Sequence, residues 1–268
     1  MSLAGRSVVR YGFVLATSAR QQWVYRSELL ARAIQMVLFM VIFMALWTAA
    51  YGTGQAELGG YTLVEMVWYL AMTETIVLST SRIFMEISEA VKAGDLAYTL
   101  ARPLSYPLFQ VASSLGNSAP RFLLNLLTAS AVVLLGMRQF AGSLPGLAAF
   151  LGLAALALLL DALIAVLIGL AAFWIEEVTP IFWIYSKLVF TVGGMFLPLE
   201  LFPAGLRQVV SWLPFQFITY APAHAFVQFE PEFVLQSLAG QVAYITLFAV
   251  AVLWVWRRAQ RRMVVHGG

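Results

Sequence analysis

The sequence contains no cysteine and only two histidines, His224 and His266. Without cysteine the chain cannot form disulfide bonds, thiolate metal sites or a cysteine nucleophile, and two distant histidines cannot form an HExxH zinc site. Lysine is equally scarce. Neither Lys92 nor Lys187 follows a glycine, so the phosphate-binding motif G-x-x-x-x-G-K-[ST] is absent. We therefore expect no catalytic residue, metal site or cofactor in this chain.

Charged residues are also few, at 11% of the 268 residues, whereas 62% are hydrophobic. With a mean hydropathy of +0.85, the chain has more apolar surface than one soluble core of this length can bury. The composition therefore indicates an integral membrane protein surrounded by lipid. The net charge of +3 does not require nucleic acid, because no soluble face carries basic residues interleaved with base-reading side chains.

Six apolar segments are long enough to cross a hydrocarbon core roughly 30 Å thick. We expect an all-α fold with one membrane domain over residues 1–268 and spans at residues 30–51, 61–81, 122–137, 147–175, 181–199 and 237–256. The third span has an alternative start near Leu108, in which case Pro120 would kink the helix.

Before the first span, the apolar residues Val8, Tyr11, Leu15 and Ala19 recur at helical spacing among arginines. This pattern predicts that residues 1–29 form an amphipathic helix lying on the cytoplasmic leaflet.

The distribution of basic residues favours an orientation with both termini in the cytoplasm. In that orientation only Arg138 and Arg207, of the 16 Lys and Arg residues, lie outside. We expect a multi-pass protein of a bacterial plasma membrane with this orientation.

The connection between the second and third spans, residues 82–107, is unusually polar. Glu86, Glu89 and Lys92 follow one another at i, i+3, which places them along one helical face, while Ile87 and Val91 line another. The segment continues with Gly94, Asp95, Leu96, Leu100, Arg102 and Pro103. The pattern fits either a helix that docks a soluble partner or a solvated loop on lipid headgroups.

A second unusual segment, residues 193–235, lies on the opposite side. Pro198, Pro203 and Pro214 cannot sit inside one straight spanning helix, yet the segment stays strongly apolar. Gly193 and Gly194 permit a sharp turn. We expect short helices that re-enter the outer leaflet as an external gate, with an ordinary external loop as the alternative.

Carboxylates at membrane depth are costly and seldom face lipid. Glu74 and Asp161 fall inside predicted spans, which leaves two explanations for each: a role in a transport pathway or a structural hydrogen bond. Glu65 also falls inside a predicted span but lies nearer its outer end. Glu177 closes the fourth span at a depth expected to be similar to that of Lys187, which leaves a salt bridge or a second partner contact open.

Taken together, these features resemble the permease subunits of type-2 ATP-binding-cassette transporters. The resemblance rests on an amphipathic first helix, six spans, a charged connection "EISEAVKAGDLAYTLARPL" and a proline-punctuated "GGMFLPLELFP" before the last span. It extends to a G-[DE]-L-x-x-x-L-x-[RK]-P phrase in that connection, here residues 94–103.

The resemblance implies that residues 86–102 form a coupling helix seated on an ATPase subunit, and that the 193–235 segment helps to close the outer end. It also implies two kinds of partner, ABC ATPase subunits and a second permease, identical or related, since one six-span chain is half of the family's pathway.

An ATP-driven exporter is therefore the leading functional hypothesis. The alternative is a proton-coupled secondary transporter that uses Asp161 and Glu74 as a relay. An integral membrane enzyme is the weakest hypothesis, because no nucleophile and base gather at one membrane face.

Overall fold

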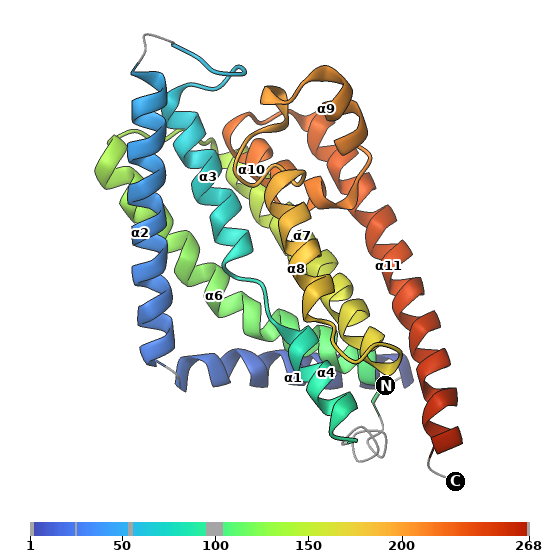
Figure 1. Ribbon diagram of the computed structural model, residues 1–268. Helices are drawn as coiled ribbons and strands as arrows, with labels where there is room; N and C mark the ends of the chain where they lie inside the picture. The colour runs from blue at the N-terminus through green and yellow to red at the C-terminus, as the bar shows by residue number, and fades with distance from the viewer. Residues whose placement is uncertain (1–2, 25, 53–55, 95–103, 267–268) are drawn as a thin grey trace.

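The computed structural model describes residues 3–24, 26–52, 56–94 and 104–266, and these residues are mostly helical and contain no β-strand (Figure 1). Four helices are long and apolar enough to cross a membrane: α2 (Arg26–Tyr51), α6 (Tyr106–Met137), α7 (Leu144–Leu170) and α11 (Pro231–His266). The expected all-α class is thus confirmed.

The two other predicted spans are shorter helices. α3 (Leu63–Val77) has 15 residues and α8 (Thr179–Thr191) has 13. At 1.5 Å per residue they extend about 22 and 20 Å, less than a hydrocarbon core roughly 30 Å thick. The structure therefore has four helices of spanning length where the sequence indicated six spans.

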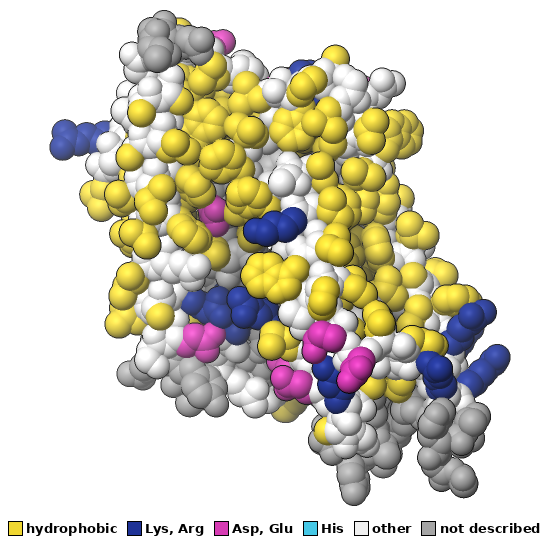
Figure 2. All heavy atoms as spheres, in the orientation of Figure 1, with side chains coloured by type: hydrophobic (Ala, Val, Ile, Leu, Met, Phe, Trp, Pro, Cys, Tyr) yellow, Lys and Arg dark blue, Asp and Glu magenta, His cyan; other side chains and the backbone are white. Residues whose placement is uncertain are grey.

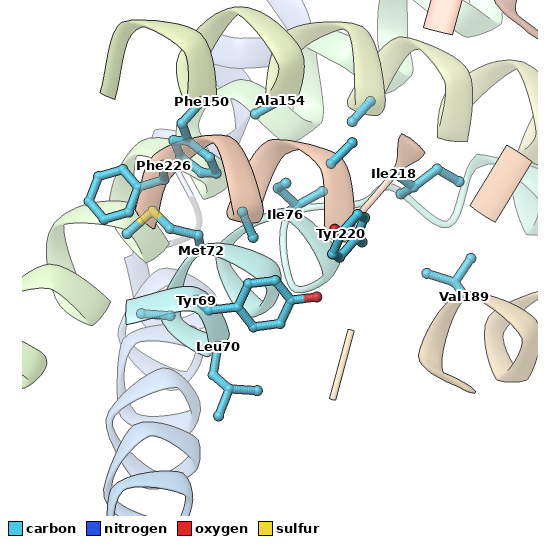
Figure 3. Packing of buried hydrophobic residues seen from close by; sticks show 14 of the residues in the cluster. Tyr69, Leu70, Met72, Ile76, Phe150, Ala154, Val189, Ile218, Tyr220 and Phe226 are labelled. Carbon is cyan, nitrogen blue, oxygen red and sulfur yellow. The ribbon is translucent and has the colours of Figure 1, made fainter. Parts of the chain in front are cut away.

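The core lies where α3, α7 and α10 (Tyr220–Val227) meet (Figure 3). Every residue of α10 is buried, and so are the eleven consecutive residues from Met66 to Ile76 in α3. Phe226 of α10 packs between Phe150 of α7 and the α3 residue Trp68, with ring centroids 5.9 and 5.5 Å away. α3 and α10 are enclosed by other helices, so apolar side chains occur on all sides of each helix and not along one face only.

Local sequence signals explain where two of the helices begin. Thr62 and Glu65 form a capping box at the start of α3, with the Thr62 amide donating to Glu65 Oε2 over 2.8 Å. Glu65 therefore caps the N-terminal end of α3, which agrees with its expected position near one end of the predicted span. α6 begins at Tyr106 with Pro107 in its first turn and contains Pro120, so the earlier start of the third span is confirmed.

α1 (Leu3–Val24) lies across one end of the molecule, nearly perpendicular to α2 (Figure 1). It packs closely on α6, because a Cβ on Gly116 would lie 2.4 Å from the carbonyl oxygen of Leu15. Its apolar residues Val9 and Phe13 remain exposed. This arrangement fits the amphipathic helix expected from the sequence, although α2 begins at Arg26, four residues before the expected span.

Both chain termini lie at the end of the molecule that carries α1 and α4 (Ile83–Lys92), as Figure 1 shows. Most charged side chains visible in Figure 2 gather at this same end, while the rest of that face is largely apolar. We call it the α1 end, and the opposite end the α9 end, after α9 (Ala204–Val210).

The proline-rich segment forms short helices at the α9 end. Gly194, with φ of +77°, makes the turn after α8. Pro198 and Pro203 immediately precede the 3-10 helix Leu199–Leu201 and α9, and Pro214 begins the 3-10 helix Pro214–Phe217. Proline favours these positions because the first residues of a helix need no amide donor.

Candidate functional site

α4 is the helical part of the charged connection, and it is amphipathic as the sequence predicted. Its apolar face is buried through Ile83, Phe84 and Ile87, while Glu86 and Glu89 are exposed. Gly94, with φ of +74°, follows the last turn of the helix. Asp95, Leu96, Leu100, Arg102 and Pro103 lie outside the described residues.

Two close contacts fix α4 to the membrane helices. A Cβ on Gly169 of α7 would lie 2.8 Å from Cβ of Ile87, so glycine is what allows this approach. The ring of Phe84 stacks on Phe182 of α8, with centroids 3.9 Å apart and planes inclined by 15°. A displacement of α4 must therefore move α7 and α8 as well, because close-packed contacts transmit strain.

An ion pair holds the last turn of α4 to the segment before α8. Lys92 Nζ donates to Glu177 Oε2 over 3.0 Å. Hydrogen bonds from the Thr179 hydroxyl, and then from Lys92, lower the pKa of Glu177 to about 2. In contrast, partial burial raises the pKa of Glu86. The expectation that Lys187 lies at the depth of Glu177 is wrong, since Lys187 is two turns into α8 and lines a cavity nearer the middle of the protein.

A polar cavity of 740 Å³ opens beside α4 at the α1 end, and we call it the vestibule. Glu28 lies at its wall and pairs with two arginines, Arg32 at 2.8 Å and Arg121 at 3.6 Å. Arg82 and Glu86 also line the vestibule. Its lining is therefore charged and rich in arginine.

A second cavity, of 390 Å³, adjoins the vestibule, and we call it the central cavity. The two cavities share Val77, Leu78, Thr80, Phe182 and Ser186 as lining residues. Phe39, Phe43 and Phe190 add aromatic surface to the central cavity. The two cavities therefore lie side by side, the vestibule at the α1 end and the central cavity among α2, α3, α7 and α8.

Both carboxylates predicted at membrane depth line the central cavity, which the sequence alone could not have shown. Asp161 Oδ1 accepts a hydrogen bond of 2.6 Å from the Tyr185 hydroxyl. Glu74 is only 1% exposed, and its Oε2 has no hydrogen-bond partner among the described residues. The two carboxylates therefore share a cavity but differ in how far their hydrogen bonding is satisfied.

At the α9 end a polar cluster, which we call the outer cluster, comprises Tyr61, Glu200, Tyr220 and His224. The Tyr61 hydroxyl lies 2.5 Å from His224 Nδ1 and 3.2 Å from Glu200 Oε2. The Tyr220 hydroxyl donates to Glu200 Oε1, and His224 Nδ1 lies 3.6 Å from that oxygen. The cluster joins the loop before α3 to the proline-rich segment and α10.

Sequence reasoning missed the outer cluster. Pro198, Pro203 and Pro214, which it did single out, position the short helices but lie outside this network. The residues of the outer cluster are separated by up to 163 positions and follow no helical or strand spacing. The available signal was a glutamate and a histidine within a segment otherwise rich in apolar and aromatic residues.

No group of three or more His, Asp or Glu side chains among the described residues lies close enough to hold a metal ion. The described residues do contain four helices long and apolar enough to cross a membrane, and an amphipathic helix, α4, that packs beside two adjoining cavities. This combination is that of a helical membrane protein with internal cavities.

The family follows from comparison with known proteins. A family model described as ABC-2 family transporter protein matches residues 29–267, and the chain therefore belongs to this family. It is a permease subunit of the ABC-2 type, the membrane component of an ABC transporter. Membership implies an association with an ABC ATPase partner, in which ATP hydrolysis usually takes place. A search of curated proteins finds no match.

Proposed function

We propose that the protein is the permease subunit of an ATP-driven exporter in the bacterial plasma membrane, with both termini and the α1 end in the cytoplasm. The observation that carries this proposal is the amphipathic α4, which exposes Glu86 and Glu89 at that end and is fixed to α7 and α8 by its apolar face. ATP and Mg²⁺ are bound by a separate ATPase subunit.

In this mechanism α4 is the coupling helix. Closure of the ATPase subunits around ATP pushes on its exposed face, and the contacts of Ile87 with Gly169 and of Phe84 with Phe182 pass the movement to α7 and α8. These helices border the central cavity, so their displacement changes its shape. Substrate then leaves toward the α9 end, where the proline-rich segment acts as the external gate.

The same proposal assigns α3 and α8 to the second and fifth of six spans. Each helix is continued by non-helical backbone, residues 78–82 after α3 and residues 192–198 after α8. Such backbone is tolerated at membrane depth where protein surrounds it or where it borders a cavity. Thr80 and Met195, one in each of these segments, line a cavity in this way.

A second permease, identical or related, is proposed to cover the outward side of α8. Trp183, Ile184 and Lys187 are exposed there. A lysine near the middle of a membrane is costly when it faces lipid, since its charge is then poorly solvated. A second permease would cover Lys187 and close the central cavity from that side.

The proton-coupled alternative would use Asp161 and Glu74, which line the same cavity. Family membership favours the ATP-driven mechanism over this alternative. The two hypotheses differ in whether transport needs an ATPase subunit.

The test is purification from the native membrane, followed by identification of co-purifying proteins and their cross-links. We expect a soluble subunit with a phosphate-binding loop, cross-linked to α4. Glu89→Arg should then lower ATP-dependent transport while leaving the spans folded, whereas the matched charge reversal Glu232→Arg at the start of α11 should not. Unchanged ATPase assembly and unchanged transport in Glu89→Arg would overturn the proposal.

A further inference from the structure

Glu74 is a carboxylate whose Oε2 has no hydrogen-bond donor among the described residues, in a cavity lined mainly by apolar and aromatic side chains. Its side chain is buried in α3, its Oε2 has no partner among the described residues, and it lines the central cavity. A buried polar group in this condition is costly unless something satisfies it. A ligand that enters the cavity can supply the missing donor.

The walls around Glu74 are suited to an apolar and aromatic ligand. Phe39 and Phe43 of α2 lie with ring centroids 6.2 Å apart, and Phe182 and Phe190 of α8 line the cavity as well. The volume of 390 Å³ is within the range of small-molecule sites. Aromatic faces also attract cations, because the ring quadrupole is negative at its face.

Two other ionisable groups line the cavity, and both already have partners. Asp161 accepts the hydrogen bond from Tyr185. Lys187 Nζ lies 5.8 Å from the ring centroid of Phe190 and 5.9 Å from that of Trp183, both on its own helix. The group left without a partner is therefore an acceptor, which favours a donor-bearing cation over an anion.

We propose that the central cavity binds a lipophilic amine, whose ammonium group donates a hydrogen bond to Glu74 and whose apolar body packs on the phenylalanine rings. This inference rests on the proposed function, for which it names the substrate class. The central cavity adjoins the vestibule at the shared residues Thr80 and Ser186, and the arginines of the vestibule repel an ammonium on that side. Lys187 repels the ammonium and weakens its binding.

The experiment is a binding titration on the full chain in lipid nanodiscs, with empty nanodiscs subtracted to remove partitioning into lipid. Three probes share one naphthalene ring: 2-(1-naphthyl)ethylammonium, its N,N,N-trimethyl analogue and 1-naphthylacetate. We expect saturable binding in the order ammonium, trimethylammonium, carboxylate, because only the first has both the charge and the N–H donors. A preference for the carboxylate would overturn the proposal.

Two variants with opposite expected signs sharpen the test. Glu74→Gln should weaken ammonium binding about tenfold or more, as expected for loss of a charge-assisted hydrogen bond. Lys187→Met should strengthen it several-fold, because the repulsive charge is removed. Glu57→Gln, an exposed carboxylate near the α9 end, should change nothing. Equal affinities in wild type and Glu74→Gln, or weaker ammonium binding in Lys187→Met, would contradict the proposal.

Lys187→Met also keeps the proposal testable if Glu74→Gln does not fold, since Lys187 is exposed. The titration contains no ATPase, so its result is independent of the exporter mechanism. Absence of amine binding would sink the amine site alone, while absence of a co-purifying ATPase would sink the proposed function alone.

Discussion

Glu74 and Glu200 are both carboxylates that lie near aromatic side chains, but they differ in their hydrogen bonding. Glu200 accepts hydrogen bonds from Tyr61 and Tyr220 and lies 3.6 Å from His224 Nδ1. Glu74 has an oxygen without a partner and borders a hollow. The first arrangement contributes to the stability of the fold, whereas the second is available for a ligand.

Aromatic rings also pack differently around the two carboxylates. In the outer cluster the Tyr220 and His224 rings stack with centroids 5.2 Å apart, and Phe233 lies 4.5 Å from His224. Around Glu74 the rings instead line a cavity that adjoins the vestibule. The side chains around Glu200 thus satisfy its oxygens by direct contacts, whereas those around Glu74 leave a space next to it.

The largest expected effect comes from breaking the outer cluster. Glu200→Ala leaves the Tyr220 hydroxyl without its acceptor and removes one of the two partners of the Tyr61 hydroxyl, which keeps His224 Nδ1. This loss should lower the free energy of unfolding by about 2 to 4 kcal/mol. Glu74→Gln should leave it unchanged or raise it, because a buried carboxylate without a partner is removed. Tryptophan fluorescence during thermal unfolding, in one detergent for all variants, measures both.

Glu200→Gln provides the matched control, since its amide oxygen keeps one acceptor and should give an intermediate loss. If Glu200→Ala and Glu74→Gln unfold at the same temperature, the contrast between a structural and a ligand-binding carboxylate is wrong.

A smaller effect is expected at the turn that supports the outer cluster. Gly194 has φ of +77°, and an added Cβ would lie 2.9 Å from Cβ of Tyr220. Gly194→Ala should therefore cost about 1 to 2 kcal/mol for the left-handed backbone, and more if Tyr220 must shift. Gly205→Ala in α9, where nothing lies within 4 Å, should be neutral or stabilising. Thermal unfolding of both variants checks this, and equal midpoints would show that the turn can relax.

The long apolar runs predicted the membrane class, and the i, i+3 spacing of charged residues predicted α4, because both are local signals in the sequence. Hydropathy overestimated the lengths of α3 and α8, because a segment buried inside the protein and a segment buried in lipid are both rich in apolar residues. The fully buried α10 shows the same ambiguity, because its eight residues, all apolar or aromatic except His224, were expected to be part of an external segment.

The candidate site was predictable residue by residue but not as an assembly. Glu74 and Asp161 were singled out because carboxylates are rare at membrane depth, yet only the tertiary packing of α3 on α7 and α8 brings them to one cavity. Glu200 could not be recognised, since its partners Tyr61 and His224 come from distant segments and an isolated glutamate near the α9 end looks like an ordinary surface residue.

The smallest effect on unfolding is expected at Glu177, which has hydrogen-bond partners like Glu200 but is fully exposed. Its substitution therefore measures what pairing contributes without burial. Its pKa is lowered to about 2 by the Thr179 hydroxyl and by Lys92. A lowered pKa means that the stabilisation is fully present above the ordinary value near 4.5 and is lost as pH falls through about 2. The difference in unfolding midpoint between wild type and Glu177→Gln should therefore be constant from pH 7 to 5.5, and narrow toward pH 3.

Solvent screens an exposed pair, so this difference in unfolding midpoint should stay well below that of Glu200→Ala. A Glu177 effect as large as that of Glu200 would mean that pairing alone, without burial, accounts for the stability of the outer cluster.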